Sequence, residues 1–430
     1  MIINLFVLAY TSFGLFIILF KKNPINNAII ILTIGLIIGY RTFEPIMGFK
    51  LHPVEVLLYA TVIRIIVSRL KPVSHLPKII LFLGLVFPLF FIVDSVTGYK
   101  PSVLVNFKNA FILIVVFFVI RYTIVDNKIL TKFCTAYLVS STLIATIGIM
   151  EFNFPDFVSS IFGFDPNNNY RDTGSILFSR LAFLYWGSHL AGNLIPPVFP
   201  ILIFLKSKNH FIVQNNILLI IFTLLNLFAV YLSGNRISWL MLTIFLLATL
   251  IYFKSSIIPH LKTYTLLITS AFVIYVYSQP VEGRYLSTFK ALTGNIDKEY
   301  DSSGQSRIER ALTAINSITN NPIGSGWGSQ GWVHSDVLQL AADLGVITGF
   351  LFFISPVLLL IRFYKLYSSV LNHYKTRFFL CMLLLIYVIV SFSLNGNILK
   401  VQTGMPLFLI WAICWAFLEN VSYKNQKIIH

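Results

Sequence analysis

Residues 301–349 have the sequence DSSGQSRIERALTAINSITNNPIGSGWGSQGWVHSDVLQLAADLGVITG and lie between two long apolar blocks. This stretch contains two arginines, a group of glycines and a histidine, although the 430-residue chain is 57% hydrophobic and only 11% charged. Soluble domains carry about 25% charged residues. Such a concentration of polar side chains in so apolar a chain indicates a face at which a reaction takes place. The apolar blocks on either side indicate the class of protein.

The apolar blocks predict membrane spans. The mean hydropathy of the chain is +0.81, and apolar runs of about 17 to 25 residues, long enough to cross a bilayer as a helix, recur along it. Lipid offers the backbone no hydrogen-bond partner, so such runs must be helical. We therefore expect an all-α polytopic membrane protein with about 12 to 14 spans, forming a single domain over residues 1–430. The expected spans lie near residues 2–20, 27–40, 54–68, 79–93, 104–120, 129–150, 186–205, 216–233, 237–253, 263–279, 337–361, 378–394 and 403–420.

The net charge of +16 is explained by orientation in a membrane, and we expect no nucleic-acid partner. Cytoplasmic loops collect lysine and arginine, and in this chain these residues concentrate in alternate short loops. The pattern predicts an external N-terminus and a cytoplasmic C-terminus. The first apolar run lacks a basic leader and a small-residue cleavage site, which favours a retained span. Cys134, Cys381 and Cys414 lie within apolar runs, where they indicate core packing and neither disulfides nor a zinc site.

With this orientation, three polar segments fall on the external face. They are a segment over residues 151–185, the tetrapeptide at residues 233–236, and a long loop over residues 280–335. Because the three are far apart in the sequence, their shared side supports a common site there.

The long loop contains a predicted amphipathic helix over residues 307–319. Ser306 and Glu309 form a capping-box pattern, and Ile308, Leu312 and Ile315 repeat at helical spacing. Pro322 ends the pattern because proline cannot continue a helix. We expect this helix to lie at the membrane interface.

Arg307 and Arg310 fall one turn apart near the predicted start of this helix. A helix N-terminus with two guanidinium groups suits a phosphate or diphosphate. The alternative is that both side chains reach towards lipid headgroups.

The glycines at positions 324, 326, 328 and 331 allow close backbone approach to a ligand, or equally a tight turn. They match neither a P-loop nor a dinucleotide fingerprint. Trp327 is either part of an interfacial aromatic belt or a surface on which sugar rings stack. His334, followed by Ser335 and Asp336, opens the next span and suits a base or hydrogen-bond donor, although a lone histidine is more often structural.

Three motifs resemble the O-antigen polymerase and O-antigen ligase family of bacterial membrane glycosyltransferases. One is Arg171-Asp-Thr-Gly174 and another is Ser233-Gly-Asn-Arg236. The third and most specific runs from Arg307 through Pro322-Ile-Gly324-Ser-Gly326 to His334-Ser-Asp336, Leu338-Gln339 and Gly345. The chain departs from the family in the two residues between Ser233 and Arg236, and in Ser335, where the family usually has asparagine.

The resemblance implies a GT-C-like fold and an enzyme that uses a glycan linked to undecaprenyl diphosphate, without a metal or other cofactor. Arg236 and Arg307 would hold the diphosphate, and His334 would orient or deprotonate the acceptor hydroxyl. Further residues that the resemblance places in substrate or diphosphate binding are Arg310, Arg171, Gly324, Gly326 and Asp336. Arg64, a charge within an apolar span, is a candidate for lining a groove for the lipid diphosphate, or else pairs with a neighbour. The acidic cluster at residues 297–301 is expected to be solvated.

Function remains open between three alternatives. The first is a polymerase of O-antigen or exopolysaccharide repeat units at the external face of the bacterial inner membrane, with a flippase and a chain-length regulator as possible partners. The second is a ligase that transfers the glycan to lipid A-core. The third is a flippase or transporter, which would place ionisable groups near the membrane midplane. In this chain only Arg64 is expected at such a depth.

Overall fold

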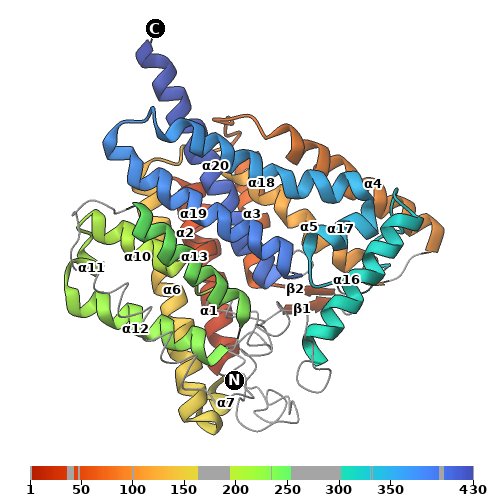
Figure 1. Ribbon diagram of the computed structural model, residues 1–430, viewed down its shortest axis with the longest axis horizontal. Coiled ribbons are helices and arrows are strands. Elements are labelled where there is room, and N and C mark those ends of the chain that lie inside the picture. Colours follow the sequence, from red (N-terminus) through yellow and green to blue (C-terminus); the bar gives the residue numbers. More distant parts are fainter. Residues whose placement is uncertain are drawn as a thin grey trace.

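The computed structural model describes residues 2–35, 43–46, 49–98, 101–162, 194–233, 235–252, 302–329, 331, 333–396 and 401–429. The described part of the chain is a bundle of helices with one small hairpin (Figure 1). Its first half comprises α1 (Ile2–Phe20), α2 (Pro24–Ile34), β1 (Phe43–Ile46), β2 (Phe49–Leu51), α3 (Pro53–Val67), α4 (Lys78–Gly98), α5 (Pro101–Ile120), α6 (Asn127–Asn153) and α7 (Pro155–Phe162). The second half comprises α10 (Val198–Ser207), α11 (Phe211–Gln214), α12 (Asn216–Ser233), α13 (Arg236–Tyr252), α16 (Ser302–Asn320), α17 (Asp336–Leu344), α18 (Val346–Tyr367), α19 (Asn372–Leu394) and α20 (Val401–Ile429).

Six of the described helices are long and apolar enough to cross a membrane: α4, α5, α6, α18, α19 and α20. Shorter apolar helices occur within α1, α2, α10, α12 and α13. The protein is therefore a helical, polytopic membrane protein, as its composition predicts. The expected span near residues 263–279 lies outside the described residues, and so does the first part of the one near 186–205.

The predicted all-α class is confirmed. The strands that the described part of the chain contains form one short antiparallel hairpin, in which Phe43 of β1 pairs with Leu51 of β2. One detail of the predicted fold is wrong. The span expected at residues 337–361 is two helices, because α17 ends at Leu344 and α18 begins at Val346. Gly345 between them has a φ of 93°, a conformation that interrupts a helix.

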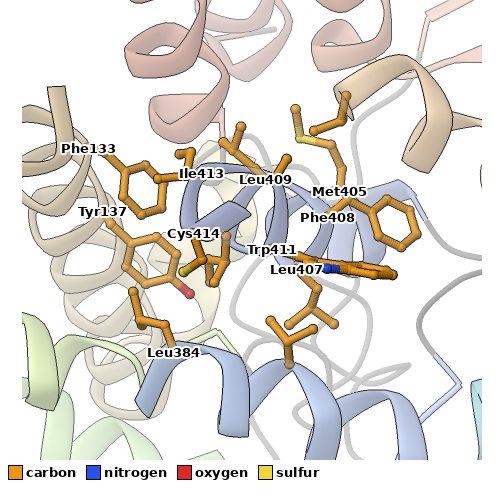
Figure 2. Close-up of a cluster of buried hydrophobic side chains, with 14 of the residues drawn as sticks. Phe133, Tyr137, Leu384, Met405, Leu407, Phe408, Leu409, Trp411, Ile413 and Cys414 are labelled. Atoms are coloured by element: carbon orange, nitrogen blue, oxygen red, sulfur yellow. The ribbon is translucent and has the colours of Figure 1, made fainter. Parts of the chain in front are cut away.

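Helix α20 forms the centre of the bundle. In α20, 89% of the apolar segment Thr403–Ser422 is buried. In α4, only 17% of the apolar segment Lys78–Thr97 is buried. Trp411 of α20 packs edge-on against Phe117 of α5 and Phe352 of α18. Figure 2 shows the surrounding side chains, among them Phe408, Ile413 and Leu384. Helix α4 is consequently a peripheral helix whose apolar surface is left for lipid.

Candidate active site

Helix α16 begins at Ser302, five residues earlier than the predicted start at Arg307. Ser306 is therefore inside the helix, and the predicted capping box with Glu309 is wrong. The physical reason is that Ser302 and Ser303 offer an earlier start, because serine favours helix N-termini. The end is as predicted, at Asn320 just before Pro322. Arg307 and Arg310 thus lie in the second and third turns and not at the helix N-terminus.

The two arginines of α16 differ in burial. Ala314 and Ile318 pack with Val333, Leu338 and Ala342 in a small apolar cluster that joins α16 to the mouth of α17. Arg307 is seven residues before Ala314, about two helical turns, and therefore on the same helix face. Arg307 is half-buried, whereas Arg310 is exposed.

The predicted apolar stripe of α16 does not form this contact. Ile308, Leu312 and Ile315 are 46%, 54% and 45% exposed. The stripe therefore points away from the bundle, and Ala314 and Ile318 make the contact with α17.

The segment between α16 and α17, residues 321–331, is a glycine turn packed on the break between α17 and α18. Its amides at Ser325 and Gly326 donate to the carbonyls of Ala342 and Asp343, at 3.0 and 2.8 Å, and the Val346 amide donates to the Pro322 carbonyl at 3.0 Å. A Cβ on Gly324, where φ is 109°, would lie 2.6 Å from the Asp343 carbonyl oxygen. The fold itself therefore requires glycine at this position.

Trp327 anchors the glycine turn to helices α4 and α5. Its amide donates to Asp94 Oδ2 at 2.6 Å, and its indole packs edge-on against Phe87 and Phe107. Trp327 is only 3% exposed, so it forms neither an interfacial belt nor a surface for sugars. A Cβ on Gly326 would lie 2.5 Å from Asp94 Oδ1, so the glycine gives this carboxylate its room.

His334 lies in the short connection that leads into α17 and is half-buried. Ser335 caps α17 by accepting from the Leu338 amide at 3.3 Å, and Asp336, the first residue of the helix, is completely buried. The Val333 amide donates to Gln339 Oε1 at 2.7 Å.

Behind His334, Asp343 accepts hydrogen bonds from three donors. These are the Gln339 amide group at 2.8 Å, the Gly328 backbone amide at 2.9 Å and the Ser329 hydroxyl at 3.0 Å. Sequence reasoning gave Gln339 no role, although this residue belongs to the third resembling motif, and it missed Asp343 and Asp94. The available signal was two polar residues four apart within an apolar run, which a lipid-facing helix does not tolerate.

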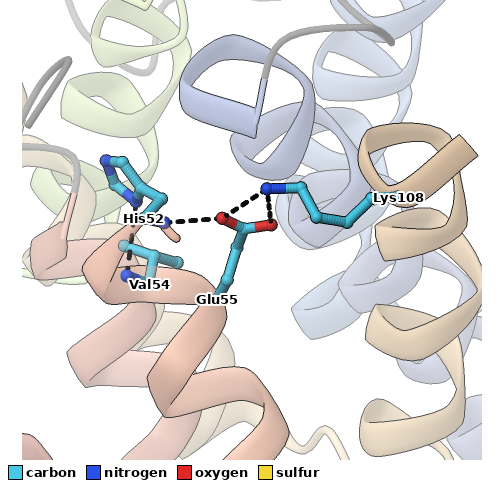
Figure 3. Close-up of polar contacts among 4 residues, drawn as sticks. All are labelled: His52, Val54, Glu55 and Lys108. Carbon is cyan, nitrogen blue, oxygen red and sulfur yellow. Dashed lines mark hydrogen bonds and ion pairs between the residues drawn. The ribbon is translucent and has the colours of Figure 1, made fainter. Parts of the chain in front are cut away.

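A buried ion pair adjoins this group, as Figure 3 shows. Lys108 Nζ of α5 lies 3.0 Å from Glu55 Oε1 and 3.2 Å from Oε2, and Glu55 Oε2 also accepts from the His52 amide at 2.6 Å. Phe107, the neighbour of Lys108, packs against Trp327. The first turn of α3 is therefore at the same end of the bundle as the glycine turn.

The remaining predicted site residues are placed less closely. Arg236 is the first residue of α13, where the Ile237 amide donates to Asn235 Oδ1 at 3.0 Å; its side chain is outside the description. Arg171 and the acidic cluster at residues 297–301 lie outside the described residues.

Arg64 occupies the last turn of α3. At a rise of about 1.5 Å per residue it lies roughly 16 Å along the helix from Pro53, and therefore towards the opposite end from His334. The structure does not bring Arg64 together with the other candidates.

The structure thus places two elements against α17, at whose start His334 and Asp336 lie. One is α16, which bears Arg307, and the other is the glycine turn with Gly324 and Gly326. Within the described ranges, no three histidine, cysteine or carboxylate side chains are grouped to hold a metal. Compared with known protein families and with curated proteins, the chain matches none.

Proposed function

We propose that the protein is a membrane glycosyltransferase that polymerises oligosaccharide repeat units linked to undecaprenyl diphosphate, at the external face of a bacterial inner membrane. The observation that carries this proposal is the packing of α16 on α17. Through Ala314 and Ile318, the face that bears Arg307 meets the helix whose mouth carries His334. An anion-binding group and a titratable base therefore come from adjoining elements.

In the proposed reaction, a hydroxyl of the acceptor glycan attacks the anomeric carbon of the donor. The new C–O bond forms as the bond to the diphosphate oxygen breaks, and the hydroxyl proton passes to His334. The leaving diphosphate is anionic, and Arg307 and Arg236 stabilise the charge that develops on it. Arg310 and Arg171 are weaker candidates for the same role. The reaction requires no cofactor.

Transport is less well supported than transfer. A transporter would gather ionisable groups on spans near the midplane, whereas Arg307 lies on α16 and His334 lies on the connection that leads into α17. Ligation to lipid A-core uses the same chemistry with another acceptor, so the product distinguishes it from polymerisation.

The test replaces Arg307, Arg236 and His334 singly with alanine in the native strain and follows carrier-linked glycans on gels. We expect about a 10²-fold loss of long chains, with single repeats accumulating on the carrier. The matched control is Arg362→Ala, because Arg362 forms an exposed ion pair with Glu419 at 2.9 Å, and such pairs contribute little. Full activity of all three folded variants would contradict the proposal. Long carrier-linked chains in a deletion strain would instead identify a ligase.

A further inference from the structure

The chain on both sides of His334 is tied to helix α17. On the N-terminal side, the Val333 amide donates to Gln339 Oε1 at 2.7 Å. On the C-terminal side, Ser335 Oγ accepts from the Leu338 amide at 3.3 Å. The backbone of His334 is therefore set by side chains and amides of the first turns of α17.

Gln339 is in turn held by Asp343, one helical turn further along. Its Nε2 donates to Asp343 Oδ2 at 2.8 Å. The same carboxylate accepts from the Gly328 amide at 2.9 Å and from the Ser329 hydroxyl at 3.0 Å. One carboxylate thus connects the glycine turn to the side chain that holds Val333.

This network occupies a fully enclosed place. Asp343 is 0% exposed and Gln339 is 1% exposed. A buried carboxylate is unfavourable unless donors surround it, and a well-packed apolar residue in its place is often at least as stable. An apolar pair would fill the same space but would leave the Val333 and Gly328 amides without these acceptors. The polar pair therefore adds a hydrogen-bonded connection between the glycine turn and Val333.

We propose that Gln339 and Asp343 are positioning residues, which fix His334 relative to the glycine turn by acting through the Val333 amide. The consequence for the reaction rests on the role proposed above for His334. A displacement of a reacting group by about 1 Å costs roughly 10²-fold in rate, so loss of the network lowers transfer without removing any group that touches substrate.

The first experiment removes the hydrogen bonds while keeping the packing. Gln339→Met preserves side-chain length, and we expect about a 10²-fold loss of long carrier-linked chains with an unchanged amount of folded protein. At position 343, asparagine can retain all three hydrogen bonds. Its side-chain oxygen accepts from Gly328 and Gln339, and its amide group donates to the Ser329 hydroxyl, which then accepts a hydrogen bond where it donated one to Asp343. Asp343→Asn is therefore expected to keep most activity, whereas Asp343→Leu falls with Gln339→Met.

A second experiment reports the position of residue 334 without using the reaction. The variant His334→Cys is labelled with a membrane-impermeant maleimide, alone and together with Gln339→Met. We expect the labelling rate to change several-fold when the network is lost. As a matched control, Thr313→Cys on the exposed side of α16 should label at the same rate in both backgrounds.

Three outcomes would overturn the positioning role. They are unchanged labelling at position 334, full activity of folded Gln339→Met, and equal losses in Asp343→Asn and Asp343→Leu, which would make charge the decisive property. Full activity of His334→Ala is a different result: it would refute the proposed function, and the labelling rates would still decide whether Gln339 positions residue 334.

Discussion

Gly345 separates α17 from α18 because the glycine turn occupies the space that a side chain would need. A Cβ at this position would lie 2.4 Å from the Ile323 carbonyl oxygen. The Val346 amide, freed by the break, donates to the Pro322 carbonyl at 3.0 Å. The apolar run is thus interrupted by a tertiary contact between two backbone segments, one at Gly345 and one at Ile323. Both segments are fixed in position.

Gly345→Ala is predicted to destabilise the protein by about 3 kcal/mol, since overpacking against backbone adds to the strain of a positive φ. The control is Gly331→Ala. Gly331 also has a positive φ, of 68°, but its Cβ would meet nothing within 4 Å, so only about 1 kcal/mol of strain is expected. Thermal unfolding of both variants in detergent measures the difference. Equal destabilisation would show that the Ile323 carbonyl does not constrain this position.

At the scale of elements, α16 exposes its apolar stripe in a direction that lipid can cover. Ile323, which follows the stripe, is 77% exposed, and Ile347 and Phe350 at the start of α18 are 65% and 59% exposed. The bond between Val346 and Pro322 keeps these residues adjacent. In the view of Figure 1, α16 runs steeply across the direction of α18. A helix that crosses the end of a span and exposes an apolar face beside that span is typical of helices that lie in the membrane surface.

We therefore predict that Leu312 contacts lipid and Thr313 contacts water. A spin label on Leu312→Cys should be relaxed more by oxygen than by a water-soluble nickel chelate, and the label on the matched variant Thr313→Cys should show the reverse. The native cysteines are buried, so the introduced thiol takes the label. Nickel accessibility at position 312 as high as at 313 would place the stripe in water or against a polar surface.

Helix α16 also shows what periodicity can and cannot predict. The repeat of Ile308, Leu312 and Ile315 correctly predicts a helix, and Pro322 correctly predicts its end. The repeat does not say what covers the apolar face. In a membrane, lipid covers large apolar side chains while small residues allow helices to approach, and here Ala314 makes the contact with α17.

The parts of the candidate site that sequence reasoning missed depend on long-range contacts. Asp94 and Trp327 are 233 residues apart and meet through a single hydrogen bond, which no local pattern announces. Asp343 falls within the single span predicted over residues 337–361, because the break at Gly345 arises only when the glycine turn packs against it. By contrast, the shared end of Arg307 and His334 followed from the order of spans alone.

At the scale of the whole molecule, the spans alternate in direction, and the lysines and arginines of the short connections select one of the two orientations. Lys21 and Lys22 follow α1, and Arg69 follows α3. Both connections belong to the side that the positive-inside rule assigns to the cytoplasm. We therefore predict that the glycine turn and the mouth of α17 are external.

Reporter fusions test this orientation. Alkaline phosphatase fused after Gly98, at the end of α4, is predicted to be active, and green fluorescent protein fused after His430 is predicted to fluoresce. The control is phosphatase fused after Ile120, at the end of α5, which should be inactive. The reverse pattern would move the candidate site to the cytoplasmic face and would exclude a reaction that takes glycans after their export.

The central position of α20 has a consequence for how the protein is made. Asn420 of α20 donates to the Val125 carbonyl, 295 residues earlier in the chain, at 3.2 Å. At synthesis rates of roughly 5–20 residues per second, Asn420 is synthesised on the order of 15–60 s after Val125. During that time the earlier helices are already in the bilayer around a centre that is not yet built. Until α20 is synthesised, lipid or the insertion machinery must occupy the centre of the bundle. Cellular quality control can therefore detect an incomplete bundle only after most of its helices have been inserted.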